Sequence, residues 1–365
     1  MIRLISSLFF AGLGAVVLFV STTSAARAEI IAVSIPLSGD YAELGQNFRT
    51  GVKLAMEKIG SDHELFIADD GCDPDLGSLA ADDIKSIQPS IVIGLLCNDT
   101  AIAVAGNLVD EQIPVLVSGA QSIRLIKDRY REAWNLWRLS PGDDYPIALA
   151  AKEIAKSWKT TPYAIVDDGT IYGRNFTDAL RLQMEALGLP PQFSDNFRAA
   201  QSTQAGLLRR LERSGVTAVF IAAATTEDLF TIASNIREFE INLDIITTEA
   251  LQVLPFLESS KEVPEGIQVL MSPVPFDAKL DTILKERDIE PSKQLYFGYA
   301  AVQIALQTIS NSPSEMPSVF TSETFETVLG QIEFSDDGSS SYNPYVLRTW
   351  NGIELLDKNN AVESQ

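Results

Sequence analysis

The sequence has few of the residues on which several classes of function depend. Its 365 residues include one histidine, two cysteines and 28 lysines and arginines against 49 aspartates and glutamates, which gives a net charge of −21. Binding to nucleic acid or to an anionic membrane surface needs a basic counterpart, so we expect neither partner. Two cysteines exclude a zinc ribbon or an iron–sulfur cluster but allow one disulfide.

The single histidine also argues against an enzyme. A serine–histidine–aspartate triad would have to use His63, which lies in a polar turn and is predicted to be solvated. The acidic residues Asp69, Asp70, Asp73 and Asp75 lack the spacing of a calcium-binding EF-hand loop, and we interpret them as a solvated loop. We therefore expect a binding protein without a metal or other cofactor.

The one long apolar run lies at the start of the chain. Arg3 precedes the apolar run 8–20, and Ala26-Arg27-Ala28 matches a signal-peptidase cleavage site. We interpret residues 1–28 as a secretory signal peptide and Glu29 as the first mature residue; a retained anchor helix is the alternative. Without this segment the chain has 26 basic and 49 acidic residues, a net charge of −23.

After Glu29, short apolar runs alternate with amphipathic stretches. The strands predicted from these runs are 30–35, 65–68, 91–95, 115–117, 163–166, 218–222, 245–247, 266–271 and 345–350. The helices predicted between them are 45–59, 76–86, 100–110, 145–156, 173–187, 204–214, 227–239 and 295–309. Buried strands alternating with helices are typical of parallel sheets covered on both faces. Because the polar stretch 140–144 divides the series, we predict an α/β fold of two doubly wound Rossmann-like lobes with a ligand cleft between them.

Each cysteine follows a predicted strand. Cys72 comes just after the second strand and Cys97 just after the third, so adjacent parallel strands would bring both to one edge of the sheet. In an exported protein a disulfide is the expected state, and the alternative is two buried free thiols. Closing this loop should stabilise the fold by about 3.5 kcal/mol.

Four groups of residues stand out as motifs. They are Pro36-Leu37-Ser38-Gly39-Asp40-Tyr41-Ala42-Glu43-Leu44-Gly45, Asp69-Asp70-Gly71-Cys72-Asp73-Pro74, Ile93-Gly94 with Cys97, and Ile165-Val166-Asp167-Asp168 with Tyr172-Gly173. With these motifs the chain resembles the periplasmic substrate-binding proteins for branched-chain amino acids (Leu/Ile/Val) that serve ABC importers. The resemblance extends to about Gly352 and implies a type I periplasmic binding fold, with three crossovers and hinge closure. It implies an N-terminal lobe of residues 29–140 plus 272–330, a C-terminal lobe of 141–271 plus 331–356, and a disordered tail, 357–365.

The first lobe is expected to hold the ligand's carboxylate. The family uses backbone amides and hydroxyls after the third and fourth strands, where this chain has Asn98 and the run Gly119, Ala120 and Gln121. Asn98 also precedes the helix predicted from Thr100, and the free N–H groups at a helix N-terminus bind anions. The alternative role for Asn98 is that of a helix N-cap.

The second lobe is expected to close on the ligand. By resemblance, Glu249 occupies the place of the glutamate that holds the α-ammonium group, and Tyr172 that of a tyrosine that covers the ligand. The alternatives are an exposed loop glutamate and a tyrosine packed on its own lobe.

Four positions depart from the family pattern. Asn98 and Gln121 replace a serine and a threonine, Ala224 replaces a tyrosine, and Gln294 stands near an expected aromatic residue. These departures predict a pocket that is wider or more polar than one for leucine, isoleucine or valine. We expect a monomeric periplasmic receptor that binds an amino acid or an amide-bearing solute and delivers it to ABC transporter permease subunits. The alternative is a periplasmic sensory or accessory protein that reports a metabolite to a signalling partner.

Overall fold

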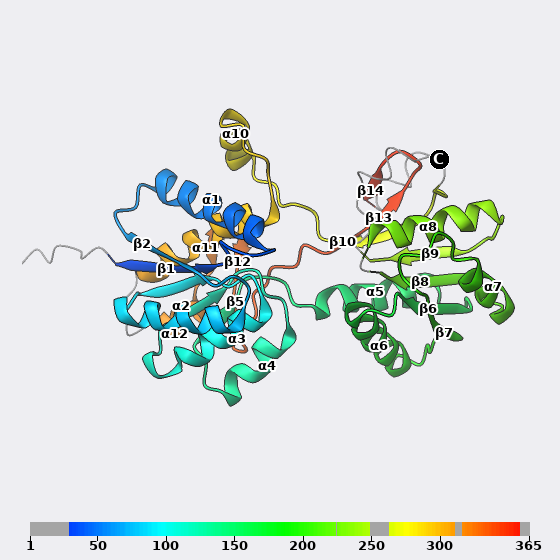
Figure 1. Cartoon of the computed structure of the whole chain (residues 1–365), viewed down its shortest axis with the longest axis horizontal. Coiled ribbons are helices and arrows are strands. Elements are labelled where there is room, and N and C mark those ends of the chain that lie inside the picture. Colours follow the sequence, from blue (N-terminus) through cyan, green and yellow to red (C-terminus); the bar gives the residue numbers. More distant parts are fainter. Residues whose placement is uncertain (1–28, 224, 249–262, 311–315, 358–365) are drawn as a thin grey trace, which may run out of the picture.

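The computed structural model describes residues 29–223, 225–248, 263–310 and 316–357, which form two α/β lobes (Figure 1). The predicted signal peptide, residues 1–28, and residues 358–365 of the predicted tail lie outside the described residues. Within the described ranges, no helix is both long enough and apolar enough to cross a membrane.

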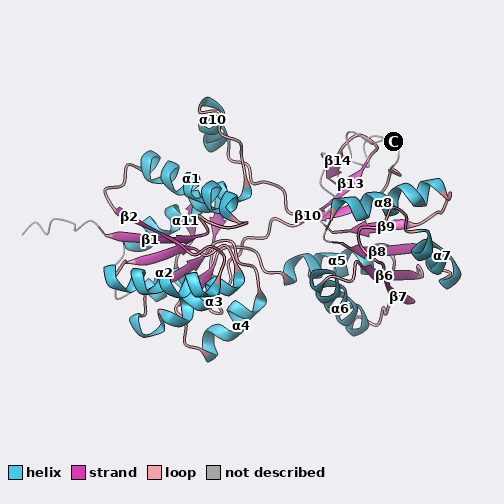
Figure 2. Ribbon diagram, viewed as in Figure 1, coloured by secondary structure: helices cyan, strands magenta, loops and turns pink. Residues whose placement is uncertain are grey.

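The first lobe contains a five-stranded parallel sheet in the order β2-β1-β3-β4-β5. In Figure 2 its strands lie between helices on both sides. Its strands are β1 (Ile30–Ile35), β2 (Glu64–Asp69), β3 (Ile91–Gly94), β4 (Val115–Val117) and β5 (Leu136–Arg138). Its helices are α1 (Ala42–Ile59), α2 (Pro74–Ile87), α3 (Asn98–Asn107), a 3-10 turn (Val109–Glu111) and α4 (Ile123–Arg131). Later segments return to this lobe as α10 (Ala278–Glu286), α11 (Lys293–Ile309), α12 (Met316–Ser322), β11 (Phe325–Thr327) and β12 (Gly330–Ile332). Apolar strands covered on both faces give this lobe its core, as predicted.

Helices α1 and α11 pack on the same face of the first sheet and touch through two glycines. A Cβ atom on Gly51 would lie 1.9 Å from the carbonyl oxygen of Leu295, and one on Gly298 would lie 2.2 Å from that of Phe48. Both helices need glycine at these positions because their backbones are in direct contact. The returning segment is therefore part of the first lobe's core.

The second lobe contains a seven-stranded sheet in the order β14-β13-β10-β9-β8-β6-β7. Its strands are β6 (Tyr163–Asp167), β7 (Phe193–Asn196), β8 (Ala218–Ala222), β9 (Asp244–Thr247), β10 (Gln268–Met271), β13 (Val346–Trp350) and β14 (Leu355–Asp357). Its helices are α5 (Asp144–Ser157), α6 (Ile171–Ala186), α7 (Ala205–Ser214) and α8 (Thr226–Glu238). Helices α5 and α6 cover one face, and α7 and α8 cover the other. The last two strands, β13 and β14, run antiparallel to their neighbours, so the sheet is mixed.

The chain passes between the lobes three times, after β5, after β10 and before β13 (Figure 1). The third passage differs from the predicted boundary at residue 330. Ile332 and Phe334 are buried in the first lobe's core, where the Phe334 ring lies 5.2 Å from the ring of Phe320. These two apolar side chains hold residues 331–341 on the first lobe. The chain therefore crosses to the second lobe only after this segment, at 341–345.

Candidate ligand-binding site

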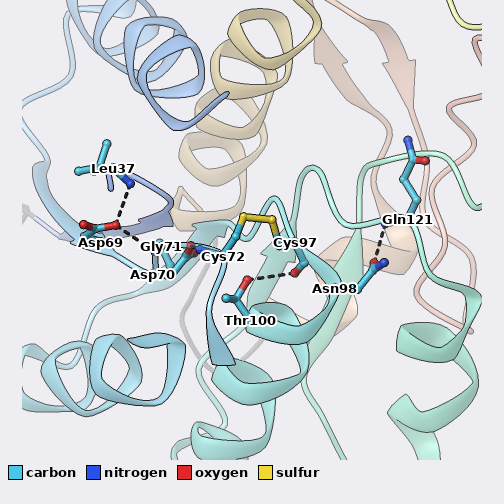
Figure 3. Close-up of a disulfide and its surroundings, with 10 residues drawn as sticks. Leu37, Asp69, Asp70, Gly71, Cys72, Cys97, Asn98, Thr100 and Gln121 are labelled. Atoms are coloured by element: carbon cyan, nitrogen blue, oxygen red, sulfur yellow. Dashed lines mark hydrogen bonds between the residues drawn. A yellow bond between two sulfur atoms is a disulfide. The ribbon is translucent and has the colours of Figure 1, made fainter. Parts of the chain in front are cut away.

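Loops at the carboxyl ends of β2, β3 and β4 meet at one edge of the first sheet. Cys72 and Cys97 form the predicted disulfide there, with their Cα atoms 5.4 Å apart (Figure 3). The predicted adjacency of their strands is wrong, because β1 lies between β2 and β3. Strands two places apart in a sheet are separated by about 9.6 Å. Cys72, which has a φ of +55°, therefore reaches Cys97 across the end of β1.

The acidic loop before Cys72 has a structural role. Asp70 is fully buried and accepts hydrogen bonds from the Ser34 hydroxyl and from the Cys72 amide, both at 3.0 Å. Asp69 accepts one from the Leu37 amide at 2.7 Å. Burial raises the pKa of Asp70. The prediction of a solvated loop is therefore wrong for Asp70, which holds the disulfide loop against β1.

Asn98 is the first residue of α3, and its side chain holds the neighbouring loop. Its Oδ1 accepts a hydrogen bond from the amide of Gln121 at 3.1 Å (Figure 3). It accepts a second from the amide of Ser122 at 3.0 Å. Asn98 is thus not the N-cap of α3; that residue is Cys97, whose side chain makes no capping bond. With Oδ1 engaged in this way, the Nδ2 group of Asn98 is a hydrogen-bond donor at the cavity.

In the loop after β4, most backbone amides donate hydrogen bonds to acceptors within the protein. Ala120, which is buried, donates to the carbonyl oxygen of Leu95 at 3.1 Å, while Gln121 and Ser122 donate to Asn98. Gly119 allows a close approach, as predicted, but the neighbour is Leu96: a Cβ atom would lie 2.8 Å from its Cα. Of Gly119, Ala120 and Gln121, only Gly119 keeps an amide without an acceptor among the described residues.

The N-terminus of α3 opens on the same place. The amides of Asn98, Asp99 and Thr100 belong to the first turn, whose N–H groups have no partner within the helix, and no side chain in the described part of the protein caps them. The helix dipole makes this end positive. Together with the amide of Gly119 and Nδ2 of Asn98, these groups form a set of donors suited to a carboxylate.

A cavity of about 400 Å³ lies over these donors. Its walls are formed by Tyr41, Cys72, Leu96, Cys97, Asn98, Asp99, Gly119, Ala120 and Gln121. Tyr41 directly precedes α1 and is 51% exposed. Sequence reasoning missed it, although it stands within the first of the motifs that carry the family resemblance. It supplies an aromatic side chain to the cavity wall.

A larger cavity of about 870 Å³ lies in the cleft between the lobes and is also lined by Gln121. The first lobe and the first crossover supply Gln121, Ile123, Lys127, Pro141, Asp143, Lys293, Gln294 and Phe297. The second lobe and its attached ends supply Asp144, Pro146, Ile147, Tyr172, Asn175, Phe176, Ala179, Ala223, Ser272 and Tyr345. The predicted cleft between two lobes is therefore present, and it carries groups of both charges.

The second-lobe wall begins at the N-terminus of α6. Tyr172 is 50% exposed, faces the cleft and has its ring 6.1 Å from that of Phe176. This terminus is capped by its own chain, because the Thr170 hydroxyl accepts from the Gly173 amide at 3.0 Å. Asp168 in turn accepts from the Thr170 amide at 3.0 Å.

Two of the positions considered for the ligand, Ala224 and Glu249, lie outside the described residues. Gln294 lines the cleft, and an aromatic side chain is present close to it. Phe297, one turn later on α11, also lines the cleft and packs edge to face on Tyr342 with ring centres 5.5 Å apart. An (i, i+3) step places the two side chains on the same helix face, so Phe297 supplies an aromatic surface near Gln294.

The described residues contain no group of three histidine, cysteine, aspartate or glutamate side chains arranged to hold a metal ion. His63 accepts a hydrogen bond at Nδ1 from the Glu29 amide at 3.0 Å, at the start of β1. That is the end of the sheet opposite to the disulfide and Asn98. The histidine therefore stands apart from the ligand donors.

Comparisons with known proteins place the chain in a family. The sequence profile of a periplasmic binding protein family matches residues 30–341. The chain belongs to that family. Among curated relatives, this periplasmic binding protein is 23% identical over 337 residues to Leu/Ile/Val-binding protein homolog 2 of Brucella abortus, covering 88% of this chain and 90% of the relative. It is 21% identical over 364 residues to a leucine-, isoleucine-, valine-, threonine- and alanine-binding protein of Pseudomonas aeruginosa, covering 95% of each.

Solved structures share the two-lobed fold of this periplasmic binding protein. A solute-binding protein of an ABC transporter from Rhodopseudomonas palustris, in complex with p-hydroxybenzoic acid, matches with a TM-score of 0.69 and 17% identity, covering 90% of this chain and 95% of that chain. A branched-chain amino acid transporter substrate-binding protein from Streptococcus pneumoniae, in complex with isoleucine, matches with a TM-score of 0.64 and 15% identity, covering 90% and 98%. These likenesses confirm the predicted fold.

Proposed function

We propose that this protein is the periplasmic solute receptor of an ABC importer and that its ligand is a small carboxylate. The first lobe binds the carboxylate, and the second lobe then closes over the rest of the molecule. The observation that carries the proposal is the uncapped N-terminus of α3, which opens with Asn98 and Gly119 into a cavity that shares Gln121 with the cleft between the lobes. An anion there gains from the helix dipole and from several N–H donors at once.

Two ligand classes share this carboxylate chemistry. Relatives are named for leucine, isoleucine and valine, and a structural neighbour holds p-hydroxybenzoic acid. An amino acid also has an ammonium group, for which we propose Glu249 as the partner, whereas an aromatic acid has none. Tyr41, Tyr172 and Phe297 supply aromatic surfaces that suit either an aliphatic side chain or a benzene ring. Amino acids and aromatic acids therefore both belong in the ligand screen.

Thermal-shift and calorimetric titrations of the mature protein test the proposal. The probes are L-leucine, L-isoleucine, L-valine, benzoate and 4-hydroxybenzoate, each compared with its primary amide. A ligand at one hundred times its dissociation constant stabilises the folded state by about 2.7 kcal/mol. We expect at least one acid to bind and its amide to bind at least a hundredfold more weakly. Equal binding of acid and amide would contradict a carboxylate site at α3.

A Glu249→Gln variant separates the two ligand classes. If the ligand is an amino acid, loss of the carboxylate that faces its ammonium should weaken binding by roughly 2 to 5 kcal/mol. If the ligand is an aromatic acid, its affinity should stay within about twofold of the wild type. Unchanged leucine affinity would remove Glu249 from the site. The monomeric state that we propose is checked by light scattering with and without ligand.

A further inference from the structure

Arg138, the last residue of β5, places a charged side chain inside the protein directly behind the ligand loop. It is 1% exposed. Its Nη1 donates to the carbonyl oxygens of Gln121 at 3.0 Å and Ser122 at 3.1 Å. These are the same two residues whose amides are held by Asn98 on the other side of the loop. The loop is therefore fixed at both its N–H and its C=O groups.

The first crossover joins this arrangement. The Asp143 amide donates to the Gln121 carbonyl oxygen at 3.0 Å, and the Asp143 carboxylate accepts from the Ile123 amide at 3.2 Å. A Cβ atom on Gly142 would lie 2.6 Å from Nη2 of Arg138 and 2.1 Å from Oδ1 of Asp144. A methyl group at this position would therefore have to displace the guanidinium of Arg138 and the carboxylate of Asp144.

The first-lobe segment that leads into the third crossover is bonded here as well. The Arg138 amide donates to the Gly338 carbonyl oxygen at 2.8 Å, and the Ser340 amide donates back to the Arg138 carbonyl oxygen at 3.1 Å. The Ser340 hydroxyl donates to the Leu139 carbonyl oxygen at 2.8 Å. Tyr145, at the start of α5, donates its hydroxyl to the Ser340 carbonyl oxygen at 3.0 Å. The first passage between the lobes is thus bonded, beside Arg138, to the segment that leads into the third passage.

The charge of Arg138 is balanced by the crossovers. Burial lowers the pKa of Arg138, and the carboxylates of Asp144, Asp143 and Asp337 oppose that shift. A buried cation is tolerated only where anions and hydrogen-bond acceptors compensate for its lost hydration. The planar guanidinium donates to two carbonyl oxygens at once, which a lysine ammonium on a flexible stem does not reproduce in the same geometry.

We infer that Arg138 is a positioning residue that joins the ligand loop, residues 119–122, to the first crossover and to the segment 338–340 that leads into the third, so that ligand contact and lobe closure are coupled. The inference rests on the proposed function. Hinge closure needs backbone rotation in short connecting segments such as 139–145 and 341–345. Because Asp143 and Tyr145 are bonded to groups held by Arg138, rotation of the first crossover must shift the ligand loop, and a ligand seated on that loop favours one hinge position.

Hydrogen exchange of the ligand-free protein tests the positioning role without any ligand. We expect the amides of Gln121, Ser122 and Ile123 to exchange at least ten times faster in Arg138→Lys than in the wild type. The matched control is Arg181→Lys on α6, where Arg181 pairs with Glu185 at 2.8 Å on the surface. The control should leave these three amides unchanged. Exchange in Arg138→Lys within twofold of the wild type would overturn the inference.

Two gentler variants test the link to the hinge. Tyr145→Phe removes only the hydroxyl that reaches Ser340, and Gly142→Ala inserts a methyl group between Arg138 and Asp144. Spin labels on Lys53→Cys in α1 and Glu212→Cys in α7 report the distance between the lobes. Both variants should broaden or shift that distance distribution without ligand. The control Gly106→Ala, where a Cβ atom meets nothing within 4 Å, should not. Unchanged distributions in both hinge variants would overturn the coupling.

The two proposals fail in different ways. If no acid in the panel binds the wild type, the carboxylate-receptor proposal fails, while the exchange and distance results still decide the role of Arg138. If an acid binds, Arg138→Lys should weaken it at least tenfold, and Arg181→Lys should bind as the wild type does. Normal ligand affinity in Arg138→Lys would show that the loop does not depend on Arg138, and would overturn the inference with the receptor function intact.

Discussion

Two helix N-termini border the cleft, and they differ in how their amides are used. At α3 the N-cap is Cys97, which makes no side-chain capping bond, so the first-turn amides face the cavity. At α6 the Thr170 hydroxyl takes the Gly173 amide, and the acidic pair Asp167 and Asp168 stands just before the helix. The first terminus is suited to an anion from outside the protein, while the second is satisfied by its own chain and would repel one.

This difference assigns separate tasks to the two lobes. The wall at α3 is organised before any ligand arrives, by the disulfide, by buried Asp70 and by the bonds from Asn98 to the neighbouring loop. The wall at α6 contributes exposed surface, chiefly the half-exposed ring of Tyr172. A ligand that binds the organised wall first loses little free energy to loop ordering, and the second lobe adds its contacts on closure.

Removal of the disulfide should give the largest difference in stability between the two lobes. The double variant Cys72→Ser/Cys97→Ser removes the covalent link between two residues that are 25 positions apart in the sequence. The open loop should lower the free energy of unfolding by about 3.5 kcal/mol. Denaturant unfolding followed by hydrogen exchange of each lobe gives the measurement. The loss should fall on the first lobe and leave α6 protection unchanged. Equal destabilisation of both lobes would contradict separate organisation of the two walls.

Asn98→Ala should have the next largest effect. It removes the acceptor of the Gln121 and Ser122 amides and one donor from the cavity. We expect the bound acid identified in the screen to be held about tenfold more weakly, equivalent to about 1.4 kcal/mol. Isothermal titration provides the measurement. Affinity within twofold of the wild type would show that Asn98 does not organise the ligand wall.

Thr170→Ala is the matched change at the other helix. Loss of this N-cap should lower the free energy of unfolding by about 1 kcal/mol, measured by urea denaturation. Affinity for the same acid should stay within about twofold, because the α6 amides do not bind it. If Thr170→Ala weakened binding as much as Asn98→Ala, both helix termini would take part in anion binding.

A pH comparison of two buried aspartates should give the smallest effect. Burial raises the pKa of both Asp70 and Asp167 above the usual 3.8. Each therefore binds a proton more tightly in the folded state, and the resulting stabilisation is present below pH 3.8 and lost as pH rises through the folded pKa. Asp70→Asn and Asp167→Asn should each remove part of this pH dependence from urea unfolding. The change should be larger for Asp70, which is 0% exposed against 9% for Asp167.

Most of the fold could be predicted because its strands are short apolar runs. The strands 30–35, 115–117 and 218–222 occur with the predicted bounds, since continuous burial on both faces leaves little choice of residue. The apolar pattern does not predict strand β5, because one of its three residues is Arg138. A charged residue in a sequence indicates an exposed position unless the buried groups that bind it are known. Strand β7 was missed because it is an edge strand with polar residues on its exposed positions.

The candidate site could be predicted in outline but not in its bonding. The places after the third and fourth strands follow from the order of elements, because ligands bind at the carboxyl ends of parallel strands. The partners of Asn98 lie 23 and 24 residues away, so local pattern does not reveal that its side chain serves the loop and not its own helix. The same holds for Arg138 and Ser340, which only the folded chain brings together.

The glycine contact between α1 and α11 bears on the order in which the chain folds. Gly51 and Gly298 are far apart in the sequence. Each nevertheless contacts the backbone of the other helix so closely that no side chain would fit between them. The core of the first lobe therefore stays incomplete until α11 is available, even though its five strands precede residue 140. Contacts between residues far apart in the sequence are slow to form. During synthesis, which proceeds from the N-terminus, the first lobe therefore cannot complete its core until α11 has been made.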